Sequence, residues 1–546
     1  MGVQVRLPAT GAVLDLDPDL SFALEMENPM LDDSGMPTAY STQISFLPTP
    51  TNLRAFGYFD MLMMDPQVKT LAAELWICGV MMFSGTLVYD SIEDGKLNYT
   101  FSGKDIESEW SKKIWQRPIL YKAVGEEAIT TLFSDIWAGM YENQGVYAPV
   151  MVNKDMTASE DSGADLSVKY HNHVNLSSQG GYSPRKVMTP VFRISAILSD
   201  EFRLIMVDES LKDYLDVLVM VGLYKTDTDT WCNGWPSDEV EVETSLPDVT
   251  GYEVLQGMLK MFCATMFADG QHYRMLSAET VLSSAAELDW SRKMSDVWES
   301  SVEEAQGYRF SYGNSDDENT MAQADAEKVD TVGLLESLMS SAISLAKHIS
   351  LGDVYSKSNG YFDMVWHELG NVEPENTENT FDNSVDFELV RSVPDKLMLS
   401  VYEETEVRRT YYRMIPIVEP ADLGERGSKM YVGLMSQGQL SDKQIVFEKE
   451  PYYDSGGRWH FLDFDSGMSL APKDLYGKFH KSFKEWIAKD RQVIKADMDL
   501  SPVDIANFRM WRKVVLNGRQ FIVKKLSFTF YANSDRIESS AEFLSL

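Results

Sequence analysis

The chain has 546 residues, 44% hydrophobic and 24% charged, which is the composition of a folded globular protein and excludes a disordered one. Its 84 acidic and 49 basic residues give a net charge of −35, which disfavours binding to nucleic acid or to an anionic membrane surface. Residues 471–546 hold 14 basic and 9 acidic residues, so this end is near +5 and suits docking on another component, whereas the remaining 35 basic and 75 acidic residues give about −40.

The first predicted elements are β-strands between residues 40 and 105. The stretch ELWICGVMMFSGTLVYDS holds two short apolar segments around Gly79, and we expect a further turn at Ser84-Gly85. In KLNYTFSG the residues Leu97, Tyr99 and Phe101 alternate with polar residues, which indicates a half-buried strand. Short strands with such turns are typical of a barrel or a sandwich.

The segment ISFLPTPTNLRAFGY, residues 44–58, carries two prolines close together. Proline fixes φ, removes a backbone donor and biases the preceding residue away from the helical region. We therefore expect Pro48 and Pro50 to end a strand and to form a stiff, non-helical bridge to the next one.

Residues 152–187 are polar and rich in Gly, Ser and Asn, and predict a long loop or a domain junction. Apolar residues at helical spacing follow over 191–202, and YLDVLVMVGLYK, residues 214–225, reads as a buried strand.

The clearest helix is predicted over residues 250–267. Thr250 and Glu253 form a capping box, and an apolar stripe follows on one face, made of Tyr252, Leu255, Leu259, Phe262 and Met266. The stretch QHYRMLSAE then predicts a returning strand. Together these elements indicate a small α/β unit over roughly 191–295.

Residues 299–332 and 353–390 are acidic and poorly periodic, so we expect strands joined by long exposed loops, with one helix near 331–349. Residues 405–450 read as β-structure.

The C-terminal region begins with a wide helical stripe over 475–487. In LSPVDIANF, Ser501 is placed to cap a helix that begins at Pro502. Asn517-Gly518 then predicts a β-hairpin, because both residues tolerate the positive φ of a type I′ turn.

The sequence offers few candidates for a metal site. His171 and His173 share one face if they lie on a strand, but no third ligand is identifiable, so we interpret them as surface or hydrogen-bonded histidines. His367-Glu368 begins like a zinc-protease helix, but Asn371 stands where the second histidine is needed.

Other acidic or cysteine-containing segments fit binding motifs no better. We interpret these as turns or solvated loops: TDTDTW with Asp227 and Asp229, which lacks the remaining calcium-loop residues, and NSDDEN with Asp316, Asp317 and Glu318. The cysteines have neither metal-site spacing nor an even number for a disulfide framework: Cys78, Cys232 and Cys263.

Trp231 and Trp235 in WCNGWP could stack on a sugar ring, but the residues favour core packing at a turn. We find no phosphate-binding glycine loop and no nucleophile elbow. We therefore expect no catalytic, cofactor-binding or metal-binding residues, no cofactor, and a protein that is not an enzyme. No apolar run approaches the about 18 residues of a membrane helix.

Segments along the whole chain together resemble a large tail-protein family of phages and prophages from Bacteroides-type bacteria. The resemblance is carried by ENPML, SFLPTPTNLRAFGY, GVMMFSGTLVYDS, LPDVTGYEVLQGMLKMFCATMFADGQHYRM, ELDWSRKM, DLYGKFHKSFKEWIAKDRQVIKADMDLSPVDIANF and VVLNGRQFIVKKLSFTF. It covers about half of the chain and is weakest over residues 299–400.

This family is similar in plan to baseplate hub and tail-tip hub proteins. The resemblance implies a multidomain α+β protein with tail-tube-like β-barrel domains at both ends and a small α/β unit between them. The expected boundaries are 1–110 for the first barrel, 111–190 for a loop-rich segment, 191–295 for the α/β unit, 296–470 for a β-rich domain with acidic loops, and 471–546 for helices and a hairpin that complete the second barrel.

The same resemblance implies a structural virion protein, assembled in the host cytoplasm, that forms a homotrimer. Its implied partners are the tail tube or distal tail protein and the spike or fibre proteins, with DNA passing through the ring. Two other functions stay open at this point: a carbohydrate-binding tail adhesin that uses Trp231 or Trp235, and a hydrolase of the cell wall or of polysaccharide.

Overall fold

The structure is a computed structural model of the 546-residue chain. It describes the main folded parts together with a set of strands between them. The main parts are residues 3–57 except 33 and 37, 70–103, 110–116, 191–222 except 199–201, 246–313 except 270–271, 379–390, 427–436, and 470–546 except 471 and 535.

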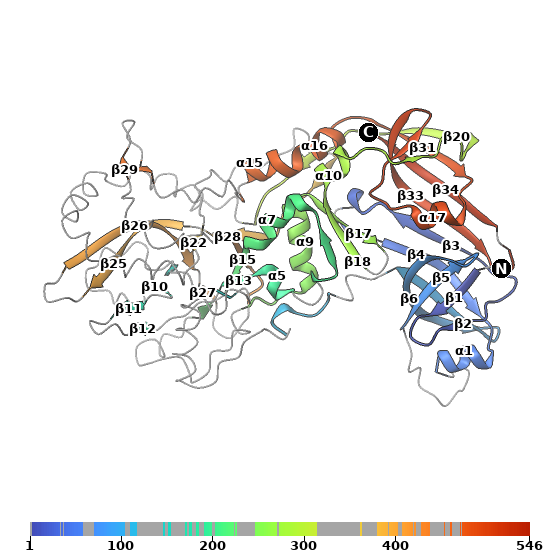
Figure 1. The fold of residues 1–546 in the computed structure, drawn as a ribbon, viewed down its shortest axis with the longest axis horizontal. Helices are drawn as coiled ribbons and strands as arrows, with labels where there is room; N and C mark the ends of the chain where they lie inside the picture. Colours follow the sequence, from blue (N-terminus) through green and yellow to red (C-terminus); the bar gives the residue numbers. More distant parts are fainter. Residues whose placement is uncertain are drawn as a thin grey trace.

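The largest element is a 13-stranded sheet, to which both ends of the chain contribute (Figure 1). Its main path runs β2 (Ala12–Leu14), β1 (Val3–Leu7), β5 (Thr70–Ile77), β6 (Val80–Glu93), β7 (Lys96–Gly103), β4 (Thr38–Phe46), β3 (Ser21–Glu27), β33 (Arg519–Tyr531), β34 (Ile537–Ser545), β31 (Arg491–Met498) and β20 (Met294–Glu303). Two short strands complete it off this path, β32 (Val514–Leu516) beside β33 and β19 (Leu288–Asp289) beside β32.

The described strands form no closed barrel, so the expectation of barrel domains at the two ends is wrong in that respect. The predicted β-structure at both ends is present. The reason for the difference lies at β3, which has β4 on one side and β33 on the other. Because its second edge is occupied by a strand about 500 residues away, β3 extends one sheet instead of closing the N-terminal strands on themselves.

The proline-rich segment differs from the expected non-helical bridge. Strand β4 does end at Phe46, but α1 (Pro50–Ala55) follows at once. Thr49 is its N-cap, and Pro50 occupies the first turn, where the missing backbone donor is harmless. The proline that was expected to prevent a helix therefore begins one.

The expected turn at Ser84-Gly85 is also absent, because β6 continues through it. A side chain at Gly85 would lie 2.1 Å from the carbonyl oxygen of Ser102 and 2.8 Å from the ring of Phe101, so the glycine permits close approach of β7. The turn expected near Gly79 is present, with positive φ at Cys78 and Gly79.

The small α/β unit lies beside this sheet (Figure 1). A three-stranded sheet, β14 (Ile205–Val207), β18 (His272–Ser277) and β17 (Ala264–Asp269), is accompanied by α5 (Ile194–Ile197), α7 (Glu209–Val217), α9 (Gly251–Met261) and α10 (Ala278–Ser283).

The predicted capping box and the returning strand of this unit are confirmed. The helix, however, ends at Met261 rather than near 267, because Cys263 adopts a φ of 43° and turns the chain into β17. Residues 214–217 belong to α7 instead of the predicted strand, which begins at Leu218 as β15 (Leu218–Val221).

The C-terminal elements agree closely with expectation. The helical stripe forms α15 (Pro472–Leu475), the π-helical segment η7 (Tyr476–His480) and α16 (Lys481–Ile487). Ser501 caps α17 (Pro502–Asn507) in a capping box with Asp504. Asn517 and Gly518 have φ of 50° and 81° between β32 and β33, as a type I′ turn requires.

The remaining described elements are short or belong to smaller sheets. The predicted β-structure of 405–450 includes β26 (Val407–Val418) and β28 (Met430–Ser436), while the predicted helix at 331–349 lies outside the described residues. These elements are η1 (Pro29–Leu31), η2 (Ile114–Gln116), β8 (Val146–Tyr147), β9 (Met151–Asn153), β10 (Tyr170–His171), β11 (Val174–Leu176), β12 (Tyr182–Pro184), β13 (Val191–Arg193), β16 (Tyr224–Lys225), β21 (Gly307–Arg309), β22 (Tyr361–Phe362), β23 (Thr380–Asp382), β24 (Phe387–Leu389), β25 (Ser392–Val401), β26 (Val407–Val418), β27 (Pro420–Ala421), β28 (Met430–Ser436), β29 (Tyr452–Tyr453) and β30 (Trp459–His460).

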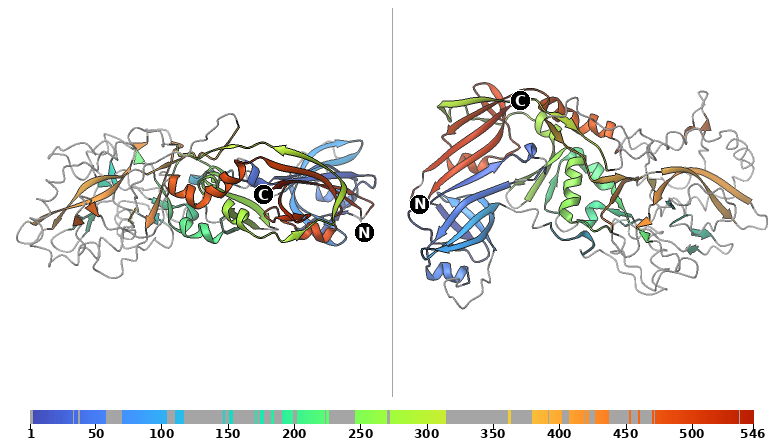
Figure 2. Two further views of the ribbon diagram at one scale, coloured as in Figure 1. Left: turned by 90° about the horizontal axis from the view of Figure 1, so that it is seen from above. Right: turned by 180° about the vertical axis from the view of Figure 1, so that it is seen from behind.

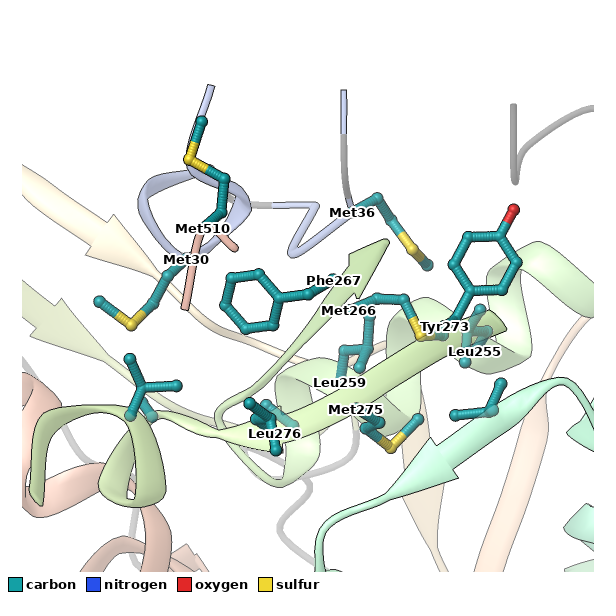
Figure 3. Packing of buried hydrophobic residues seen from close by; sticks show 14 of the residues in the cluster. Met30, Met36, Leu255, Leu259, Met266, Phe267, Tyr273, Met275, Leu276 and Met510 are labelled. Carbon is teal, nitrogen blue, oxygen red and sulfur yellow. The ribbon is translucent and has the colours of Figure 1, made fainter. Parts of the chain in front are cut away.

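The large sheet and the α/β unit share one hydrophobic core. Figure 3 shows the junction, where Met30 and Met36 from the N-terminal part and Met510 from the C-terminal part gather around Phe267 of β17. The backbone joins the same parts, because the Met266 N–H donates to the carbonyl oxygen of Gly35 at 2.8 Å. Figure 2 shows from two further directions that both termini lie in the part of the molecule built around the large sheet.

Candidate assembly surface

The two ends of the chain are joined along β3 and β33. The antiparallel register pairs Ser21 with Tyr531 and continues to Glu27 opposite Lys525. On one face the rings of Phe22 and Phe530 pack at 5.3 Å, while the ammonium group of Lys525 contacts the carboxylate of Glu25 at 2.8 Å and that of Glu27 at 3.3 Å. These hydrogen bonds raise the pKa of Lys525. Apolar packing, two ion pairs and seven backbone pairs therefore act together at this joint.

The asparagine of the proline-rich segment has a structural task in this sheet. Asn52 is fully buried, and its amide nitrogen donates to the carbonyl oxygens of Asp15 at 2.8 Å and Leu47 at 2.7 Å. Its side-chain oxygen accepts from the Asp15 N–H at 3.0 Å. Asn52 thereby fastens α1 to the chain after β2 and to the end of β4. Phe56, just after the helix, stacks on Tyr99 of β7 with ring centroids 4.2 Å apart.

One edge of the large sheet is an exposed strand, β20. Among the described strands it pairs only with β31, and its other edge has no strand beside it (Figure 1). Most of its ten residues are exposed, including three apolar ones: Val297 at 81%, Val302 at 65% and Trp298 at 48%. Edge strands of this length present backbone groups that can pair with another chain.

The exposed strand is nevertheless held firmly at its C-terminal end. The carboxylate of Glu303 contacts the guanidinium of Arg491 at 3.1 Å and also the ammonium group of Lys524. The Arg491 side chain is 2% exposed, and its guanidinium lies 4.9 Å from the ring centroid of Trp486. The N–H of Gln306, just beyond the strand, donates to the carbonyl oxygen of Ile487 at 2.8 Å. The edge is therefore presented in a fixed position.

The direction of the outer backbone groups follows from the hydrogen bonds of β31. The Gln492 N–H donates to Ser545 Oγ on the β34 side at 2.9 Å, so it points away from β20. In an antiparallel pair the residues alternate between facing the partner and facing away. The residue opposite Gln492 is Val302, so Val302, Ser300 and Trp298 turn their N–H and C=O groups toward the open edge.

A connected polar cluster lies in the core instead of at the surface. His480 is fully buried, and its Nε2 lies 2.9 Å from the carbonyl oxygen of Met261. A carbonyl only accepts, so Nε2 carries the proton and Nδ1 accepts from the Tyr308 hydroxyl at 2.5 Å. Asn383 donates to the same hydroxyl at 3.0 Å and to the carbonyl oxygen of Lys260 at 2.7 Å.

Burial determines the protonation states in this cluster. Burial lowers the pKa of His480 to about 3, although the hydrogen bond to Met261 raises it. Burial also raises the pKa of Tyr308. Both groups are therefore neutral near pH 7. The cluster connects η7, the end of α9, β21 and the residues after β23, and its hydrogen bonds are internally satisfied, which suits a role in holding these elements together.

A small cavity lies next to this cluster. It has a volume of about 20 Å³, room for about one water molecule, and its lining includes Cys263, Thr265 and Asn383. Burial raises the pKa of the Cys263 thiol to about 12, so the thiol is protonated near neutral pH and is a poor nucleophile.

Among the residues that the structure describes, the sequence candidates are not brought together into a site. Cys263 is buried beside this cavity, Cys78 is exposed in the β5–β6 turn, and the backbone of His171 lies in β10. The other candidates lie outside the described residues: Cys232, His173, Asp227, Asp229, Trp231, Trp235, Asp316, Asp317, Glu318, His367 and Glu368.

The exposed strand was not identified from the sequence. Only the second half of its segment, MSDVWESSVE, falls in the acidic and poorly periodic region predicted over 299–332. The segment holds a weak signal of a β-strand with two different faces. In the alternation of a strand, Trp298 and Val302 lie on one face, and Glu299 and Glu303 lie on the other. The pairing with β31, about 190 residues away, is what makes this segment an edge.

Within the part of the chain that the structure describes, no group of three or more His, Cys, Asp or Glu residues is placed to hold a metal ion. In the same residues, no helix combines the length and apolar character needed to cross a bilayer.

No family model and no curated protein matches the chain. Three solved structures similar to it are described as tail proteins. The 43 kDa tail protein of prophage MuSo2 from Shewanella oneidensis has a TM-score of 0.33 and 7% identity, with 100% of this chain and 98% of that chain covered. A tail protein from Neisseria meningitidis MC58 has a TM-score of 0.34 and 8% identity, with 100% and 96% covered. Prophage tail protein gp18 from Listeria monocytogenes EGD-e has a TM-score of 0.29 and 8% identity, with 99% and 94% covered.

Proposed function

We propose that the chain is a structural phage-tail protein and serves as the baseplate or tail-tip hub. In this role it forms a homotrimeric ring, joins the tail tube or distal tail protein to spike or fibre proteins, and lines the exit path of the DNA. It is a component of the virion and not an enzyme. The division into domains at residues 110, 190, 295 and 470 remains part of this proposal.

The observation that carries the proposal is the joint between β3 and β33. Two of the segments that carry the resemblance to tail proteins lie near opposite ends of the chain, at 45–58 and 514–530, and both belong to the unit organised by this one sheet. Their distinctive residues have structural tasks: Asn52 fastens α1, and Asn517-Gly518 makes the hairpin turn. Residues selected for geometry in this way fit an assembly component better than a catalyst.

The charge of the chain supports the same role. A net charge of −35 opposes adhesion of DNA to the wall of a conduit, because both carry negative charge. We expect the purified chain to show no measurable binding to double-stranded DNA at physiological salt, in a filter-binding assay with a basic DNA-binding protein as the positive control.

The direct test is the mass and shape of the purified full-length chain. Mass photometry is expected to give three times the 61.8 kDa of one chain, and negative-stain electron microscopy is expected to show threefold rings. Co-expression with the tail-tube and spike proteins encoded beside it is expected to give a stable complex. A monomer that binds neither protein would refute the proposal, as would turnover of peptidoglycan or polysaccharide.

A further inference from the structure

We propose that the open edge of β20 is a docking site for one basic β-strand of a different protein. The incoming strand pairs with β20 and extends the sheet, and its residues alternate between lysine or arginine on one face and apolar residues on the other. This inference rests on the edge itself and does not require the ring-shaped hub.

The backbone of the edge supplies the attachment. Trp298, Ser300 and Val302 turn their N–H and C=O groups outward, which provides up to six backbone hydrogen-bonding groups along one short segment. The anchoring of Glu303 to Arg491 and Lys524 keeps this row in place before a partner arrives. A fixed edge lowers the entropy cost of pairing, as in other cases where a strand is added to an exposed sheet edge.

The side chains of the edge specify the two faces of the incoming strand. Trp298 and Val302 are opposite Ala496 and Gln492 and lie on the face that continues toward the core side of β31. Their large exposed apolar surfaces would be covered by apolar residues of a partner. Glu299 is opposite Lys495 and lies on the other face, where it favours a basic residue.

Charge complementarity favours a different protein over a second copy of this chain. Residues 294–304 contain Asp296, Glu299 and Glu304, together with Glu303, whose carboxylate already contacts Arg491 and Lys524, and they contain no lysine or arginine. The strand at the opposite end of the sheet, β2, lies within residues 8–19, which contain three aspartates and no basic residue. Pairing β20 with either edge of a second copy would therefore place acidic segments together, which is unfavourable.

The test uses synthetic peptides as probes and the full-length chain as receptor. The first peptide has twelve residues in which lysine alternates with valine or threonine. The second has the same composition in scrambled order, the third carries glutamate in place of lysine, and the fourth is the first peptide with its consecutive central backbone amides N-methylated, so that neither edge of the strand can donate. Fluorescence anisotropy at physiological salt measures each dissociation constant.

The matched variants are Ser300→Pro and Ser300→Ala. Both lose the serine hydroxyl, which accepts from the Gln492 side chain at 3.0 Å, but only proline removes the outward N–H. Because that N–H does not face β31, the proline leaves the β20–β31 ladder intact. Circular dichroism melts of both variants establish that the chain stays folded.

The expected result is saturable binding of the alternating lysine peptide to the wild type and to Ser300→Ala. Ser300→Pro is expected to weaken this binding by at least about fivefold, the effect of one lost net hydrogen bond. The scrambled and glutamate peptides are expected to bind at least about tenfold more weakly than the alternating peptide. The N-methylated peptide is expected to lose binding as well, and it tests strand pairing without any change to the protein.

Three results would each overturn the proposal. The first is equal binding of the alternating and scrambled peptides, which would mean non-specific attraction to an acidic protein. The second is equal binding by the proline and alanine variants together with full binding of the N-methylated peptide. The third is concentration-dependent self-association that Ser300→Pro abolishes, which would identify a second copy as the occupant. A monomer that binds neither the tail-tube nor the spike protein would refute the hub alone, so the two proposals fail separately.

Discussion

The buried His480 makes the stability of the protein depend on pH in a predictable way. In the folded chain burial holds its pKa at about 3, whereas an unfolded chain restores the ordinary value of 6.5. Because the folded pKa is the lower one, the unfolded chain takes up the proton first as the pH falls. The contribution of neutral His480 to stability is thus complete above pH 6.5 and is lost progressively between pH 6.5 and 3.

The magnitude follows from these two pKa values. Over the whole window the loss reaches about 5 kcal/mol, and between pH 7.0 and pH 5.0 it is about 2 kcal/mol. Unfolding is best measured in the upper part of this pH window, because solubility is lowest at the isoelectric point of about 4.5 and pH 5.0 is still above it.

The assay is urea unfolding of the full-length chain at pH 7.0 and 5.0, for the wild type and for His480→Gln. Glutamine can still form hydrogen bonds but does not titrate, so the variant is expected to lose about 2 kcal/mol less than the wild type between these pH values. Hydrogen exchange of the 476–487 peptide identifies the unfolding transition that contains the site.

Tyr308→Phe is the matched control. It removes the hydroxyl that donates to Nδ1 and should lower the free energy of unfolding by about 1–3 kcal/mol at both pH values. Since burial is the main cause of the low pKa, the pH dependence should remain. An identical pH dependence in the wild type and His480→Gln would refute the reasoning.

Three other buried residues carry predictions that thermal and urea unfolding can check. Asn52→Ala should lower the free energy of unfolding by about 2–3 kcal/mol, because it leaves two carbonyls and one N–H without their partner; an unchanged stability would show that the α1 attachment does not matter. Gly257→Ala should cost about 1–2 kcal/mol, because the new Cβ would lie 2.4 Å from the ring of Phe387. Gly477→Ala, with no atom within 4 Å, is its control and should be neutral or stabilising by up to about 1 kcal/mol. Lys513→Met should lower the free energy of unfolding by about 1–3 kcal/mol, because the buried ammonium group donates to the carbonyl oxygens at the end of α10. An unchanged stability would mean that the free-energy cost of burying the charge is as large as the contribution of these hydrogen bonds.

The local features that the sequence predicts correctly are those set by short-range physics. The capping box at Thr250, the cap at Ser501 and the turn at Asn517-Gly518 each depend on a few adjacent residues, so they can be predicted without knowledge of the fold. The alternation at Leu97, Tyr99 and Phe101 is of the same kind, and these three side chains are buried.

The wrong predictions arise where a local sequence pattern is compatible with two different structures. Pro50 is compatible both with an extended segment and with the first turn of a helix, and the cap at Thr49 together with the buried contacts of Asn52 selects the helix. Gly85 is compatible with a turn or with close approach of a neighbouring strand, and the position of Phe101 selects the second.

The sequence by itself determined the acidic character of the chain, its β-rich ends and the α/β unit between them, because composition and periodicity carry that information locally. Only the tertiary structure decided that β3 pairs with β33 and that β20 is left as an exposed edge. Strand pairing across about 500 and about 190 residues depends on which edges the rest of the fold leaves open. No local pattern in the sequence records that choice.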